Sequence, residues 1–164
     1  MFFRAVLLLV VACVQRSCQH QSGPLKDEVL TEDRRFCRGE LEISYPDLDI
    51  RSCMIIPQEF REKISQEWGP PQVRLAMADK GSSLKEGDIK GTLLSEYTPP
   101  TPPKRTGFHR YKFLLYEQNT GQVLSLSQQE QQSLGNWDPE AFVEKFELVG
   151  PVASLLFLTQ HFKD

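Results

Sequence analysis

The chain has no apolar run long enough to cross a membrane as a helix, which needs about 20 residues. Its longest apolar stretch covers only residues 5–12. It has no excess of positive charge, because 19 Lys and Arg residues stand against 22 Asp and Glu, for a net charge of −3. Without a basic stripe, a nucleic-acid partner is not expected. The 164 residues, 40% of them hydrophobic, predict one ordinary soluble domain.

Sequence signatures of common enzymes are also missing. There is no Gly-x-Ser-x-Gly nucleophile motif and no Gly-rich loop that would hold a phosphate. The three His residues have no metal-ligand spacing, and no Cys-x-x-Cys pair supports a zinc site. We therefore predict a protein that is not an enzyme and uses neither a metal nor a cofactor. A hydrolase built on His109 is the alternative with the least support.

The N-terminus has the order of a secretory signal peptide. A single charge, Arg4, precedes the apolar run 5–12, and a polar segment follows. We predict that residues 1–13 are removed and that the mature chain enters the secretory pathway, to become extracellular or lysosomal. The alternative is a buried N-terminal helix or strand. Removal takes away one positive charge, so the mature balance is 18 − 22 = −4.

Cleavage at this point leaves an odd number of cysteines in an oxidising compartment. The three are Cys18, Cys37 and Cys53. Two of them can form a disulfide, and the sequence does not say which two. The remaining thiol would be buried and inert, reactive, or paired with another chain.

Alternating apolar residues predict several short strands. Strands are expected at 41–45 and 73–77, with a short apolar run at 53–56. A run at 111–118, the turn Asn-Thr-Gly and a second run at 122–127 predict a central β-hairpin.

Three helices are predicted as well. A short one is expected within 27–36, and another begins after Asp138, a capping residue followed by proline. The apolar segment 152–162 predicts a C-terminal helix. Between Phe60 and Ile64 there is room for at most one helical turn before two prolines.

Four prolines in residues 98–103 predict an extended loop. Such a loop could also bind an SH3 or WW module, although a secreted chain would not meet these cytosolic modules. His109, Arg110 and Tyr111 follow at the start of the predicted strand. A His and an Arg at a strand end can hold a phosphate or a carboxylate. The alternative is a hydrogen-bonded His at a polar strand end.

The block PPTPPKRTGFHRYKFLLYEQ, residues 99–118, resembles the signature of the phosphatidylethanolamine-binding protein family. In that family a proline pair precedes Gly-x-His-Arg-Tyr and an apolar strand. Less specific matches occur in the same order along the chain, at 41–46, 68–73, 81–97, 142–148 and 150–153. With the signal peptide, the resemblance points to the secreted branch of the family. It implies a mainly β fold, an antiparallel β-sandwich with peripheral C-terminal helices.

The resemblance implies binding of phosphatidylethanolamine or other anionic headgroups and, in some relatives, modulation of kinase signalling. Two family motifs are absent, however: the Asp-Pro-Asp-Ala-Pro segment and a following His-x-Trp segment. This predicts an internal deletion near 75–80 within a domain at 36–164, preceded by an extension at 14–35. The sandwich would then lack central strands.

The residues that carry over to a remnant ligand pocket are His109, Tyr111, Arg110, Gly107 and Pro102. The expected function is headgroup binding by an impaired pocket, with an affinity that is weak or lost. The alternative is an interaction protein without a ligand pocket, which associates with itself or a partner through an exposed sheet edge.

Overall fold

A computed structural model describes residues 5–13, 29–78, 83–87, 91–132, 135 and 137–164. The strands are β1 (Ala5–Cys13), β2 (Leu41–Tyr45), β3 (Leu48–Ile50), β4 (Met54–Ile55), β5 (Gln72–Leu75), β6 (His109–Gln118) and β7 (Val149–Thr159). The helices are α1 (Thr31–Phe36), α2 (Gln58–Glu62), the π-helix η1 (Lys63–Glu67), α3 (Ser83–Glu86), α4 (Gln128–Gln132) and α5 (Pro139–Lys145).

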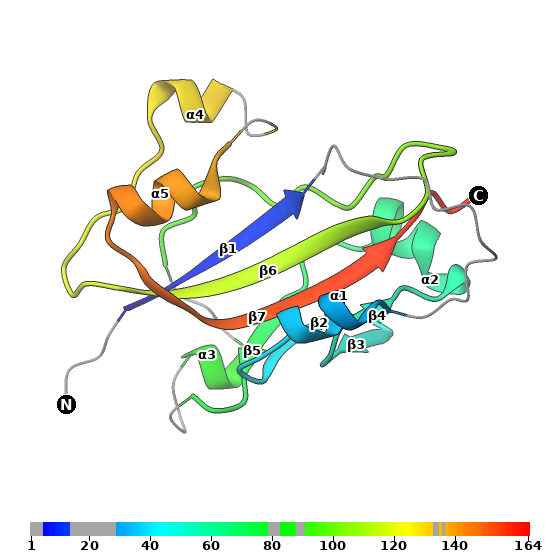
Figure 1. Ribbon diagram of the computed structural model, residues 1–164, viewed down its shortest axis with the longest axis horizontal. Helices are drawn as coiled ribbons and strands as arrows, with labels where there is room; N and C mark the ends of the chain where they lie inside the picture. The colour runs from blue at the N-terminus through cyan, green and yellow to red at the C-terminus, as the bar shows by residue number, and fades with distance from the viewer. Residues whose placement is uncertain (1–4, 14–28, 79–82, 88–90, 133–134, 136) are drawn as a thin grey trace.

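The strands form two sheets. The larger sheet has the order β1-β6-β7-β4, and the smaller has the order β3-β2-β5. β6 lies between β1 and β7 and is antiparallel to both, as Figure 1 shows. β4 pairs with the other side of β7 in the parallel direction. The long strands β1, β6 and β7 lie side by side, and the two-residue β4 lies at one edge; His109, at the start of β6, pairs with Thr159 of β7.

The main hydrophobic core contains buried side chains from both sheets. On β2, residues 41, 43 and 45 are buried and alternate with half-buried ones, as expected for a strand that packs on one face. The core members are Leu41, Ile43, Tyr45, Ile50, Ile56, Ile64, Val73, Leu75, Phe113, Leu115, Ala153, Leu155 and Phe157. A second cluster joins Tyr116 of β6 to Phe142 of α5 and to Leu148. β6 is therefore covered by apolar side chains on both faces.

Two predicted elements are wrong. The segment 152–162 is not a helix, because β7 runs through it and buries seven consecutive residues, 153–159. A strand buried on both faces reads as a continuous apolar run, which periodicity cannot tell from a buried helix. Residues 122–127 form no strand, so the predicted hairpin is absent, and β6 pairs instead with β1 and β7. Its predicted central position is confirmed.

The predictions for short strands and helices agree better with the structure. The strand at 41–45 is confirmed, and β5 ends two residues before the predicted strand does. Helix α5 begins as predicted, because the Asp138 carboxylate accepts the backbone N–H groups of Glu140 and Ala141. Around Ile64 the prediction of one turn is too short, since α2 and η1 form a continuous helical segment from Gln58 to Glu67.

The apolar N-terminal run lies in β1, which pairs with β6 from Ala5↔Gln118 to Cys13↔Arg110. In the full chain, the β6 edge expected to be exposed is thus paired. Removal of residues 1–13 would open it. The prediction of a signal peptide is not tested by this pairing, and residues 1–4 and most of the predicted extension lie outside the described residues.

Helix α1 and the strand β2 are held close to β7 by a tight backbone approach. Arg38 and Ser154 exchange backbone hydrogen bonds of 2.9 Å in both directions. The next residue, Gly39, has φ +78°, and a Cβ there would lie 2.6 Å from the Val152 carbonyl oxygen. Only glycine fits at this point. No described helix is long and apolar enough to cross a membrane.

Candidate functional site

His109 is the first residue of β6 and is half-buried beside the Pro-rich loop. Its Nε2 lies 2.6 Å from Oγ1 of Thr106. The Thr106 hydroxyl donates its one proton to the carbonyl of Pro103, at 2.8 Å. The ring N–H of His109 therefore donates to Thr106, which leaves Nδ1 as the acceptor of the neutral ring. An anion at His109 would have to bind a ring protonated at Nδ1 or displace Thr106.

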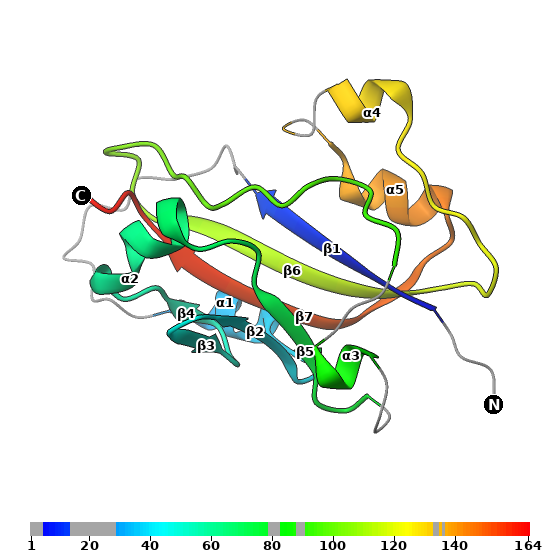
Figure 2. The same cartoon turned by 180° about the vertical axis from the view of Figure 1, so that it is seen from behind.

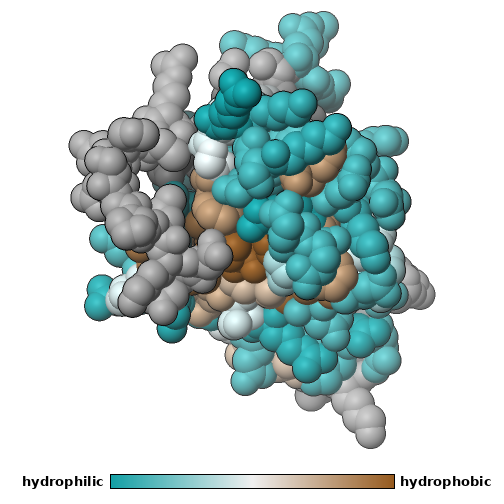
Figure 3. All heavy atoms as spheres, turned by 90° about the vertical axis from the view of Figure 1, so that its right-hand side faces the viewer, coloured by the Kyte–Doolittle hydropathy of each residue, from teal (hydrophilic) through white to brown (hydrophobic). Residues whose placement is uncertain are grey.

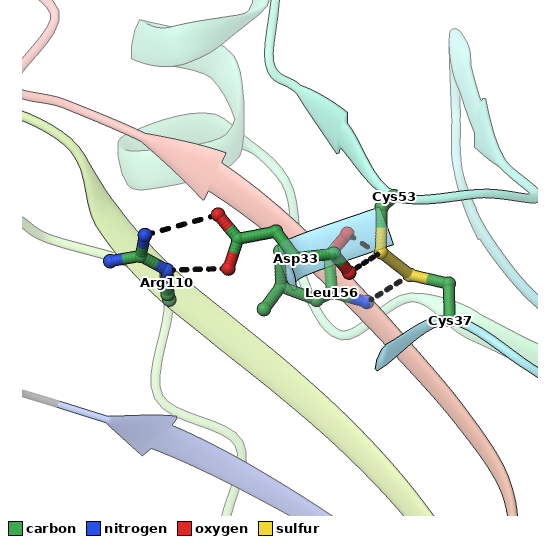
Figure 4. A network of polar contacts seen from close by, with 5 residues as sticks. All are labelled: Asp33, Cys37, Cys53, Arg110 and Leu156. Carbon is green, nitrogen blue, oxygen red and sulfur yellow. Dashed lines mark hydrogen bonds and ion pairs between the residues drawn. A yellow bond between two sulfur atoms is a disulfide. The ribbon is translucent and has the colours of Figure 1, made fainter. Parts of the chain in front are cut away.

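Arg110 forms a two-pronged ion pair with Asp33 of α1, as Figure 4 shows. Its Nε donates to Oδ1 at 2.7 Å and its Nη2 to Oδ2 at 3.0 Å. The Asp33 side chain is 9% exposed and the Arg110 side chain 29%. In this conformation, the Arg110 guanidinium donates to a carboxylate of the chain itself, although the sequence predicts that it binds an external anion.

A disulfide joins Cys37 to Cys53 directly beside this ion pair. The Cys53 sulfur lies 2.7 Å from the carbonyl oxygen of Asp33. On the other side, the backbone N–H of Leu156 donates to the Cys37 sulfur at 3.2 Å. The bridge thus joins the residue after α1 to the residue before β4, and its Cys37 sulfur accepts a hydrogen bond from β7. Cys18 lies outside the described residues.

Tyr111 belongs to an aromatic group in the core rather than to a polar surface. Its ring stacks on Phe157 with a centroid distance of 5.4 Å. Burial, with the nearby Tyr97 hydroxyl as a second cause, raises the pKa of Tyr111 to about 12. Tyr97 in turn hydrogen-bonds to Tyr45 through their hydroxyls, 2.9 Å apart. Tyr111 therefore stays neutral at physiological pH and can contribute a hydroxyl donor, but not a charge.

Pro102 and Gly107 shape the loop that leads into β6. Pro102 is buried, whereas Gly107 is exposed and has φ +72°, a conformation that L side chains rarely adopt. Figure 2 shows the segment from Gly91 to Gly107 passing along the larger sheet before the chain enters β6. The loop is held at its far end, where the backbone N–H of Arg105 donates to the Asp164 carboxylate at 2.8 Å.

A cavity of about 290 Å³ lies between this loop, η1 and the residues after β7. Its lining residues are Ser65, Gln66, Thr101, Pro102, Pro103, Lys104, His161 and Phe162. Figure 3 looks at this end of the molecule and shows an apolar area among hydrophilic residues. Of the five site residues taken from the sequence, only Pro102 lines the cavity. His109, Arg110 and Tyr111 follow one another along β6.

Sequence reasoning missed Asp33, the Tyr45–Tyr97 pair and the cavity residues around Ser65. Asp33 is one charge in a polar segment, and it lies 77 positions from Arg110. No local pattern connects residues so far apart, so only the folded chain reveals the pair. No group of three or more His, Cys, Asp or Glu side chains suited to a metal ion occurs among the described residues.

Comparison with known proteins identifies the family. The model of the family described as "Phosphatidylethanolamine-binding protein" matches residues 55–152, which are 98 of the 164 residues. The chain belongs to the phosphatidylethanolamine-binding protein family. The matched region begins in β4 and includes the Pro-rich loop and all of β6. The family resemblance drawn from residues 99–118 is thereby confirmed.

One similar family-like sequence is the Drosophila melanogaster protein named "Putative odorant-binding protein A5". It is 36% identical over 74 residues, which are 42% of this chain and 34% of that relative. The chain thus matches about a third of the relative's length. A function for this chain therefore has to be inferred from its own strand order and from the end of β6 at His109.

Proposed function

We propose that this protein binds the anionic headgroup of phosphatidylethanolamine or a related phospholipid and catalyses no reaction. The observation that supports this most is the Gly107–Tyr111 segment, which lies inside the matched family region and brings His109, Arg110 and Tyr111 to one strand end. The His109 ring provides a donor for phosphate oxygens once the anion displaces Thr106, and the neutral Tyr111 hydroxyl adds another, whereas Arg110 is held by Asp33. The name of the Drosophila relative also refers to binding rather than to catalysis.

The proposed pocket is impaired. The acidic family motif is missing from the sequence near 75–80, where we propose an internal deletion. The carboxylate found near the site, Asp33, neutralises Arg110 instead of completing a pocket around His109. We therefore expect weak binding, with a dissociation constant of about 1 mM, which corresponds to about 4 kcal/mol.

We place the protein in the secretory pathway, as an extracellular or lysosomal member of the branch that contains phosphatidylethanolamine-binding protein 4. The N-terminal charge and apolar run support this placement. Protein partners in signalling, as in some relatives, are part of the same proposal.

Titration calorimetry of the full chain with phosphorylethanolamine tests the function. We expect saturable, weak binding that His109→Ala reduces at least about tenfold, because a hydrogen bond to a charged group is lost. Gln129→Ala is the control, since Gln129 is exposed near the start of α4. Absence of saturable binding, or equal affinity in the His109 variant, would refute the proposal. A dissociation constant in the nanomolar range would refute the proposal that the pocket is impaired.

A second candidate function is self-association through the β6 edge. The pairing of β1 along nine residues of β6 supports it, because cleavage after residue 13 would leave these backbone groups without partners. In that case the protein would act as an interaction module without a ligand.

A further inference from the structure

Ser65 lines the cavity between η1, the Pro-rich loop and the residues after β7, and its hydroxyl is buried beside that cavity. Ser65 is 8% exposed, and its hydroxyl has no hydrogen-bond partner in the structure. A buried polar group without a partner costs about 1–3 kcal/mol. Such groups in a folded protein call for an explanation, and a ligand that completes the hydrogen bond is one. Ser65 lies in the π-helix η1, and π turns occur often at functional sites.

His161 lines the same cavity, and its ring carries a donor. Its Nδ1 accepts the backbone N–H of Lys163 at 3.1 Å. The proton of the neutral ring is therefore on Nε2, which becomes a donor. The ring is held in place by stacking on Phe162, at a centroid distance of 4.5 Å. This tautomer follows from the hydrogen bond and does not require a charged ring.

The remaining lining residues add donors and one positive charge, but no carboxylate. Lys104 provides an ammonium group, and Gln66 and Thr101 provide an amide and a hydroxyl. Phe162, Pro102 and Pro103 make the apolar part of the wall. A site with several donors, one cation and an apolar wall favours an anion that carries an apolar substituent.

Hydrogen bonds join the segments that surround the cavity. The Gln58 side chain of α2 donates to the Phe162 carbonyl at 2.8 Å. The Asp164 carboxylate accepts the backbone N–H of Arg105, at the other end of the loop. Asp164 is thus engaged with the loop backbone.

A second, wider cavity of about 610 Å³ beside the disulfide is a weaker candidate for an anion site. It is lined by three arginines, yet each already has a partner. Arg34 donates to the Val29 carbonyl, Arg38 to the Pro151 carbonyl, and Arg51 to Asp49. No unpartnered buried side chain occurs among its described lining residues.

We infer that the cavity lined by Ser65, Lys104 and His161 binds a phosphate group whose substituent lies against Pro102, Pro103 and Phe162. This site goes beyond the headgroup site proposed at His109, with which it shares only Pro102. Serine changes between staggered side-chain rotamers, so the Ser65 hydroxyl can turn toward a bound oxygen. The phosphate can come from a lipid headgroup or from a free phosphate ester.

Three probes separate these sources: inorganic phosphate, phosphorylethanolamine, and monomeric short-chain phosphatidylethanolamine. Each is titrated calorimetrically into the full chain and into Ser65→Ala and Lys104→Gln. We expect each substitution to weaken binding of inorganic phosphate about tenfold. The controls Ser95→Ala and Lys145→Gln, at exposed positions outside the cavity, should bind as the unmodified chain does. Tighter binding of the short-chain lipid than of phosphorylethanolamine identifies a lipid ligand, and equal binding a free ester.

A stability measurement distinguishes a binding role of Ser65 from a structural one. Because its hydroxyl has no partner in the ligand-free protein, Ser65→Ala should leave the melting temperature equal or higher while it weakens phosphate binding. A melting temperature lowered by Ser65→Ala would overturn the inference, as would unchanged phosphate affinity in both cavity variants. Phosphate binding that is lost only in His109→Ala would also overturn it, but would leave the proposed function standing. Absence of phosphate binding to the unmodified chain refutes the inference alone, provided that phosphorylethanolamine still binds through His109.

Discussion

At the scale of single residues, Asp33 decides what Arg110 can bind. Its carboxylate accepts hydrogen bonds from Nε and Nη2 of the Arg110 guanidinium. The Cys53 sulfur of the disulfide lies against the backbone carbonyl of Asp33. The desolvation cost of a buried ion pair is offset only by close contact between its charges, and removal of one charge leaves the other without compensation. The ion pair therefore fixes α1 onto the larger sheet and also keeps Arg110 from external anions.

This pair leads to a stability prediction. Asp33→Asn should lower the free energy of unfolding by about 3 kcal/mol, the low end for a buried pair, because part of Arg110 stays exposed. Asp49→Asn is the matched control, since Asp49 and Arg51 form an exposed pair that is worth at most about 1 kcal/mol. Urea denaturation of both variants measures the difference. Equal effects of the two substitutions would show that the Asp33 pair contributes no more than a surface pair.

At the scale of elements, strands with alternating polarity could be predicted from the sequence and strands buried on both faces could not. β2 alternates because only one of its faces meets the core. β7 lacks alternation, because β6 and β4 flank it while apolar side chains cover both its faces, so its sequence also fits a helix. Of the candidate site, the segment around His109 could be predicted from the sequence. The sequence could not supply Asp33 or Ser65, whose roles depend on contacts between distant parts of the chain.

β1 gives a prediction about the sheet edge. A chain that begins at residue 14 should self-associate at micromolar concentration, because nine residues of β6 lose their pairing partner. Sedimentation of the truncated and the full chain measures this, with circular dichroism to show that the truncated chain is still folded. A folded, truncated chain that remains monomeric would argue against the edge as an interaction surface.

At the scale of the whole molecule, three tyrosines connect the sheets and the long loop. Tyr45 lies on β2, Tyr97 on the loop and Tyr111 on β6. Burial is the largest cause that raises the pKa of each of them above 10. All three must therefore stay protonated in the folded protein at a pH where the unfolded chain already ionises.

This predicts loss of stability in alkali. The folded pKa of Tyr111, about 12, lies above the unfolded value near 10, so the folded state binds more protons between these values. Stability should be complete below pH 10 and fall as the pH rises from about 10 toward about 12. A titration that follows tyrosinate absorbance and circular dichroism together should show ionisation and unfolding in one step. The urea-denatured chain, as a control, should titrate near pH 10, and tyrosines that ionise there in the folded protein would contradict the prediction.

The position of β7 in the larger sheet also has a consequence for biosynthesis. β7 is the last strand in sequence, yet it joins β6 to β4 and meets Arg38 through backbone hydrogen bonds. Until residues from 149 onward are made, β4 has no neighbour in the larger sheet, β6 has β1 alone, and the main core lacks Ala153, Leu155 and Phe157. The larger sheet therefore cannot be completed before the end of translation, and a chaperone that shields apolar segments during translation would serve the nascent chain best.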